Sequence, residues 1–211
     1  MFIRSPSFFA GKLPWSSAAR AKWMAAREDM HSCVRSLVWS GELDAADVAY
    51  YIKDHFGQLD DICKFWLLEV IRSEFELKQK AEETWPKVTD FDRLDRAFTM
   101  LEAQGIIALH RAGFDQSDGM EEVEDAFHES GRKNSDCAGY CFYTEQDQEA
   151  ALDGSGLYIG FGHLSGHEAK AVKIGEMLYA SLVREGFNVD WDGTFESRLF
   201  LKWFRWQRRS P

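Results

Sequence analysis

The spacing of apolar residues changes near Gly105, and this change limits the fold more than any other feature of the sequence. Before Gly105, apolar side chains such as Val34 and Leu37 recur every three or four residues, which is the period of a helix. Beyond it, apolar residues gather in short runs such as 106–110 (IIALH) and 138–144 (AGYCFYT). Runs of this length are typical of buried strands. The chain is therefore predicted to be an α+β protein, with helices first and a sheet second.

Capping residues divide the first part into four predicted helices, at 16–39, 44–56, 60–83 and 90–104. Asp44 and Asp90 are expected N-caps, and Gly41, Gly57 and Gly105 follow helix ends. The connection 84–90, which contains Pro86, is the one plausible hinge. We therefore expect a helical region at 1–89 and an α+β sheet domain at 90–211, packed together as one compact unit.

The second part reads as β-α-β-β-α-β with one more strand. Strands are predicted at 106–110, 138–144, 157–162, 187–191 and 198–204. Helices are predicted from Asp118 through at least Phe127, at 146–152, and from Ala171 to a stop at Gly186. Asp192-Gly193 is a hairpin-turn signal between the last two strands. This order fits a ferredoxin-like (split βαβ) antiparallel sheet with an added hairpin strand, in which the first and third strands are parallel neighbours.

That topology predicts a candidate ligand site at one end of the sheet. The first and third strands would end together and bring His110 near His163, with Cys137 at the start of the antiparallel second strand and Asp115 in a nearby loop. Two imidazoles, a thiol and a carboxylate are zinc-type ligands. Their linear spacing matches no zinc signature, however, so we favour unrelated polar residues at loop ends and predict neither a metal nor another cofactor.

Three other patterns have structural explanations that we prefer. Cys137 and Cys141 would lie about 13 Å apart along one strand, too far to chelate one ion. Asp192 is better explained by its turn than by acid–base chemistry with Asp190. Gly160 and Gly162 leave one strand face without side chains, and close helix packing is the favoured reason, with ligand approach as the alternative.

Acidic residues are concentrated in the sheet domain. The formal charge of −10 divides into −1 for residues 1–89 and −9 for residues 90–211, and segment 115–153 carries 12 acids against Arg132 and Lys133. The leading hypothesis is a non-enzymatic binding or regulatory protein that docks a basic partner on this segment. Candidate contact residues on its predicted helix are Asp118, Glu121, Glu122 and Asp125. The alternative is an enzyme with a small ligand or metal near His110, Cys137 and His163.

The remaining features bear on partners and compartment. The tail 198–209 carries five Arg or Lys, but the acidic field opposes nucleic-acid binding, which we do not expect. Trp203 alternates with Leu199 and Leu201, so we expect it in the core. The start of the chain lacks the apolar run of a signal peptide, no run of about 20 apolar residues occurs, and four cysteines are too few for a disulfide scaffold. We expect a cytoplasmic protein that does not bind membranes.

Several phrases resemble a bacterial family catalogued as a domain of unknown function, DUF6891. They occur in order from about Val38 to the closing WQRR: VWSGELDAADV, TWPKVTDFDRLDRAF, HRAGFDQSDG, AGYCFYTEQD, GLYIGFG and GFNVDWDGTFESRL. The resemblance covers most of the chain. It implies one coherent unit and a bacterial source, and it transfers no activity, cofactor or catalytic residue.

Overall fold

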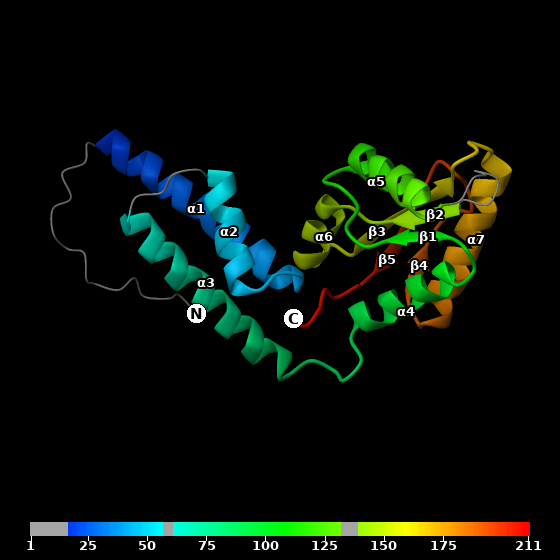
Figure 1. Ribbon diagram of the computed structural model, residues 1–211. Coiled ribbons are helices and arrows are strands. Elements are labelled where there is room, and N and C mark those ends of the chain that lie inside the picture. The colour runs from blue at the N-terminus through cyan, green and yellow to red at the C-terminus, as the bar shows by residue number, and fades with distance from the viewer. Residues whose placement is uncertain (1–16, 57–60, 132–138) are drawn as a thin grey trace.

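The computed structural model describes residues 17–56, 61–131 and 139–211, with side chains described for 27–55, 64–131 and 139–211. Within these ranges the chain forms seven helices and a five-stranded mixed sheet, which confirms the predicted α+β class. Figure 1 shows three N-terminal helices grouped on one side and the sheet with its own helices on the other.

The helical region consists of α1 (Ser17–Ser40), α2 (Ala45–Phe56) and α3 (Asp61–Glu82). The Asp44 carboxylate accepts from the first backbone N–H groups of α2, as an N-cap does. Among the described side chains, the three helices bury an apolar core that includes Val34, Leu37, Val38, Val48, Ile52, Leu67 and Ile71. The helical prediction is thus confirmed for the described part of residues 1–89.

Two helices of the sheet domain have N-caps that precede the predicted ones. Helix α4 (Asp90–Glu102) is capped by Thr89, whose hydroxyl accepts from the Asp92 N–H while the Asp92 carboxylate accepts from the Thr89 N–H. Helix α5 (Gln116–Glu129) is capped by Asp115 and not from Asp118. An N-cap side chain accepts from backbone N–H groups two or three residues later in the chain. The cap therefore precedes the first turn, whose acidic residues had suggested the helix start.

The sheet contains β1 (Ile107–Leu109), β2 (Gly139–Phe142), β3 (Leu157–His163), β4 (Asn188–Asp190) and β5 (Leu199–Lys202). Helix α6 (Glu145–Leu152) joins β2 to β3, and α7 (Glu168–Arg184) joins β3 to β4. The strands lie in the order β1-β2-β3-β5-β4, with β1 parallel to β2 and every other neighbour antiparallel. The antiparallel pairing of β4 with β5 agrees with the predicted hairpin, although β5 lies between β3 and β4.

This order corrects the ferredoxin-like expectation, in which β1 and β3 are neighbours. Strand β2 lies between them, and all four of its residues are buried. A strand that is apolar on both faces is typical of the interior of a sheet, where each of its edges pairs with a neighbour. Here β1 and β3 are those neighbours. Strand β3 is long enough to pair with β2 through residues 160–163 and with β5 through 157–159. The order of elements along the chain does not determine which edges meet.

Side chains alternate between two cores, one on each face of the sheet. Cys141, Ile159 and Leu201 face the larger core beneath α4 and α7, whereas Tyr140 and Phe142 pack beneath α5. A Cβ atom on Gly162 would collide with the Tyr140 ring, and one on Gly160 would meet the Gln116 amide. The missing side chains therefore make room for neighbouring side chains, and not for a helix backbone.

The C-terminal segment leaves the sheet and returns to the helical region (Figure 1). At the end of β5, Trp203 adopts a positive φ of 59° and is 76% exposed, so the expectation of a buried Trp203 is wrong. This turn shifts the alternation of buried and exposed side chains by one residue, so that Phe204 and Trp206 are buried instead of Trp203. The helical region contacts the sheet domain through this segment, α6 and the loop after β1, leaving both sheet faces to α4, α5 and α7.

Candidate functional site

The sheet places His110 and His163 at opposite ends. In the register, His163 lies opposite Gly139, whereas Leu109, which precedes His110, lies opposite Phe142. The two histidines are therefore about 13 Å apart along the strand direction at about 3.3 Å per residue. Their predicted proximity depended on β1 and β3 being parallel neighbours, which they are not. Cys137 lies outside the described residues.

The other candidate ligands have structural partners. Asp115 accepts backbone hydrogen bonds from Ser117 and Asp118 at the start of α5. At the end of β3, His163 Nδ1 lies 2.8 Å from the Ser165 hydroxyl and 3.2 Å from the Ser165 N–H. Within the described part of the chain, no group of three or more His, Cys, Asp or Glu residues has an arrangement that could hold a metal ion. The turn interpretation of Asp192 agrees with the hydrogen bonds that its carboxylate accepts from Thr194 and Ser197.

His110 belongs instead to a polar cluster between β1, β2 and α4. Its Nε2 lies 3.3 Å from the Asp95 carboxylate, and its Nδ1 lies 3.2 Å from the Tyr143 hydroxyl. The ring packs against Phe91 and Phe98. Burial lowers the pKa of His110 to about 4, although the nearby Asp95 carboxylate opposes this shift. The imidazole is therefore neutral at pH 7, accepting from Tyr143 and donating to Asp95.

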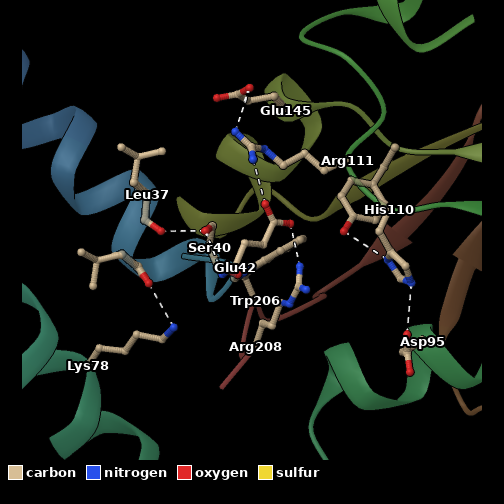
Figure 2. Close-up of polar contacts among 12 residues, drawn as sticks. Leu37, Ser40, Glu42, Lys78, Asp95, His110, Arg111, Glu145, Trp206 and Arg208 are labelled. Atoms are coloured by element: carbon tan, nitrogen blue, oxygen red, sulfur yellow. Dashed lines mark hydrogen bonds and ion pairs between the residues drawn. The ribbon is translucent and has the colours of Figure 1, made fainter. Parts of the chain in front are cut away.

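A network of charges joins the helical region to the sheet domain (Figure 2). Glu42, just after α1, forms ion pairs with Arg208 of the C-terminal segment at 2.6 Å and with Arg111 at 2.8 Å. Arg111 also reaches Glu145 of α6 at 3.0 Å. Two guanidinium groups and two carboxylates thus alternate across the junction. No sequence signal connects Glu42 with a residue 166 positions away, so sequence reasoning missed this network.

Hydrogen bonds to backbone carbonyls hold the end of α1 at the same junction (Figure 2). Trp206 donates its indole N–H to the Ser40 carbonyl at 3.1 Å, and Lys78 donates to the Val38 carbonyl at 3.0 Å. Both carbonyls belong to the last turn of α1, which leaves its carbonyl groups without helical partners. Burial lowers the pKa of Lys78 to about 8, partly offset by Glu82. The C-terminal segment and α3 therefore complete the end of α1.

Internal acids neutralise much of the basic tail. Arg198 pairs with Asp147, Lys202 with Asp190, and Arg209 with Asp92. Together with the Arg208 pair, four of the five predicted basic groups contact a carboxylate of the same molecule. These contacts supply a structural role for charges that could otherwise suggest phosphate binding.

The predicted partner surface on α5 divides into two pairs of residues. Asp118 and Glu122 accept hydrogen bonds from the backbone of Phe114 and Gly113 and so hold the preceding loop. Glu121 and Asp125 are exposed, as is Glu124, and within the described chain none of these three forms an ion pair. They follow the three- and four-residue spacing of one helix face. The outer face of α5, defined here as Glu121, Glu124 and Asp125, is therefore an exposed acidic surface that no described cation compensates.

The acids of α6 do not continue this surface. Asp147 is buried, where it binds Arg198 and caps its own helix from the N3 position. Glu145 points toward Arg111 and the helical region (Figure 2). Segment 115–153 is thus continuous in sequence but divided in space between the α5 face and the junction.

No helix within the described residues is both long and apolar enough to cross a membrane. No curated protein and no solved structure matches the chain. A family described as a domain of unknown function (DUF6891) matches residues 24–210. This match spans the helical region, the sheet domain and the C-terminal segment that connects them. The chain therefore belongs to the DUF6891 family.

Proposed function

We propose that this protein is a non-enzymatic binding protein that docks a basic partner protein on the outer face of α5. The observation that carries the proposal is the exposure of Glu121, Glu124 and Asp125, none of which pairs with a cation among the described residues. The acids elsewhere in segment 115–153 that contact Arg111 and Arg198 are already neutralised. The exposed acids of α5 are therefore the part of this segment that we assign to the partner.

An acidic face of this kind favours association with a positively charged surface. Opposite fields accelerate encounter and orient the partner before short-range contacts form. The net charge of −10 adds to the same field. Because the charges are exposed, salt should weaken binding strongly, as the Debye length falls to a few Å near 0.5 M.

The enzyme alternative has less support. It required His110 and His163 to converge, and the strand register separates them. Asp115 is used as a helix cap. The one polar cluster that contains His110 consists of a neutral imidazole held between Tyr143 and Asp95, and it contains no nucleophile of the Ser or Cys type.

Affinity capture from a bacterial lysate at low salt tests the proposal. Wild-type protein is expected to retain a basic protein that is released near 0.5 M salt. The triple variant Glu121→Lys, Glu124→Lys and Asp125→Lys is expected to lose it. Glu122 is left intact, because its bond to the Gly113 N–H would make its substitution a test of loop structure instead.

A matched variant controls for net charge. Glu76→Lys, Glu83→Lys and Glu176→Lys change three exposed acids on or beside α3 and on α7. This variant has the same formal charge as the α5 variant and should keep the partner. Equal capture by both variants, or equal loss, would show that α5 is not the docking face.

A further inference from the structure

A pocket of about 170 Å³ lies where α5 meets the sheet, beside the loop that leads into β5. Its volume is close to that of a cavity of about 150 Å³ that holds one benzene ring. Apolar surface comes from Met120, Phe142, Phe161 and Phe195, and Tyr140 and Arg198 are among its polar groups. The pocket shares no residue with the outer face of α5, so it is independent of the docking proposal.

The Tyr140 hydroxyl lacks a protein partner in this pocket. Tyr140 of β2 is 9% exposed, yet its hydroxyl forms no hydrogen bond within the described chain. The hydroxyl lies over Gly162, where a Cβ atom would collide with it. Burial raises the pKa of Tyr140, so the group stays protonated and can donate. Because most buried polar groups have a partner, this hydroxyl indicates that the pocket receives a hydrogen-bond acceptor.

Arg198 has one side of its guanidinium group occupied and the other side open. Its Nη1 donates to both oxygens of the Asp147 carboxylate, at 2.9 and 3.0 Å, whereas Nε and Nη2 donate to no described group. Arg111 shows that an arginine of this protein can bind two carboxylates, since it pairs with Glu42 and with Glu145. Nε and Nη2 together can donate two parallel hydrogen bonds to a second carboxylate.

The two polar groups lie toward opposite ends of the pocket. The guanidinium carbon of Arg198 is 4.8 Å from the centre of the Tyr158 ring, and the Tyr140 hydroxyl lies over Gly162. Tyr158 and Gly162 are four residues apart on β3, which is about 13 Å along the strand at about 3.3 Å per residue. A single ring with polar groups in para positions, hydrogen-bonded at both ends, spans a distance of this order.

We propose that this pocket binds a small aromatic carboxylate, a single ring with a hydroxyl group para to the carboxylate. The carboxylate accepts from Nε and Nη2 of Arg198, and the phenol oxygen accepts from the Tyr140 hydroxyl. The ring packs against Met120, Phe142 and Phe195. The net charge of −10 acts on the ligand mainly at long range, where salt screens it beyond about 8 Å at physiological ionic strength.

A titration with para-hydroxybenzoate, followed by heteronuclear NMR at constant ionic strength, tests the proposal. The shifts should be largest for the backbone amides of Tyr140, Gly160 and Arg198, and the ligand should raise the melting temperature by mass action. Benzoate lacks the para hydroxyl and should bind about fivefold more weakly, the effect of one neutral hydrogen bond. The uncharged para-hydroxybenzamide should bind about tenfold more weakly, since it loses the charge-assisted pair.

Two conservative variants separate binding from structure. Arg198→Lys keeps a cation beside Asp147 but removes the planar guanidinium, so the affinity for para-hydroxybenzoate should fall about tenfold. Tyr140→Phe keeps the ring and should weaken para-hydroxybenzoate about fivefold while leaving benzoate unchanged. Because the hydroxyl has no described partner, this variant should not lower the stability of the unliganded protein. The matched changes Arg205→Lys and Tyr179→Phe, at exposed positions, should alter neither affinity.

Three results would overturn the proposal. The first is the absence of shifts around the pocket, and the second is equal binding of para-hydroxybenzoate, para-hydroxybenzamide and inorganic phosphate. The third is full affinity in both pocket variants. Loss of stability in unliganded Tyr140→Phe, with equal weakening of both carboxylates, would likewise count against it, because the hydroxyl would then serve the fold and not the ligand.

Discussion

The interiors of the helical region and of the sheet domain are apolar, whereas the junction between the two regions contains many charged and polar contacts. Each region buries its own apolar cluster, one between α1, α2 and α3 and another between the sheet, α4 and α7. Where the regions meet, the contacts are mainly polar, with Glu42 between Arg111 and Arg208 and Trp206 bonded to Ser40.

The difference has consequences for how each part responds to change. Apolar cores depend on volume and packing and are nearly independent of pH and salt. A junction of ion pairs and buried titratable groups depends on proton and salt concentration. Four predictions probe the two cores, the buried His110 and the junction, starting with the largest expected effect.

Leu178→Ala in the sheet core should lower the free energy of unfolding by about 3 kcal/mol, because it removes methyl groups from a fully buried site. Urea unfolding followed by tryptophan fluorescence measures this loss. Leu178→Met, which conserves volume, should cost less than about 1.5 kcal/mol. A loss below about 1 kcal/mol for the alanine variant would mean that this core is not close-packed.

Ile52→Ala makes the equivalent change in the helical core, where Ile52 is also fully buried. If the junction couples the two regions firmly, Ile52→Ala and Leu178→Ala will shift one common transition. Separate transitions, each moved by one substitution alone, would show that the polar junction does not make the regions unfold together.

His110 should make the protein sensitive to acid. Its folded-state pKa of about 4 lies below the ordinary value of 6.5, so between these values the unfolded chain binds the proton and the folded protein does not. Stability therefore falls as the pH falls from 6.5 to 4, by about 2 kcal/mol between pH 7 and pH 5.

His110→Phe removes this titration while keeping an aromatic ring beside Phe91 and Phe98. Its free energy of unfolding, measured in urea at pH 7 and pH 5, should change by about 2 kcal/mol less than that of the wild type. The absolute cost of the substitution does not affect this difference. An unchanged pH dependence would assign the acid sensitivity to other groups.

Glu42→Gln should have the smallest effect, a loss of about 1.5 kcal/mol, because it leaves Arg111 and Arg208 without their shared carboxylate. Hydrogen exchange should show faster exchange in the last turn of α1 and in the C-terminal segment, with core amides of α7 unaffected. Added salt should destabilise the wild type more than the variant. Faster exchange throughout both cores would show that the junction is needed for the folding of each region.

The sequence predicted most of the helices and strands because their signals are local. The apolar spacing located α1 to α4, and Asp44 marked the start of α2 correctly. The candidate site failed because it depended on strand order. The signals for β1 and β3 were correct individually, but nothing in their residues specified that β2 would lie between them.

The same distinction explains the charged residues. Acids at 118–125 were correctly recognised as a cluster, but only the fold assigns Asp118 and Glu122 to loop contacts and leaves Glu121 and Asp125 facing outward. Trp203 was wrongly expected in the core because its own positive φ shifts the alternation of buried and exposed side chains at the end of β5.

The amino-acid sequence by itself determined the α+β class, the acidic character and the position of nearly every helix and strand, since each follows from neighbours within a few residues. Tertiary structure alone decided which strands pair, which carboxylates are neutralised, and where α5, β2 and β3 border a pocket. Those features depend on contacts such as Glu42 with Arg208, between residues 166 positions apart. Such contacts form only when the whole chain has buried its apolar surface, and no local pattern encodes them.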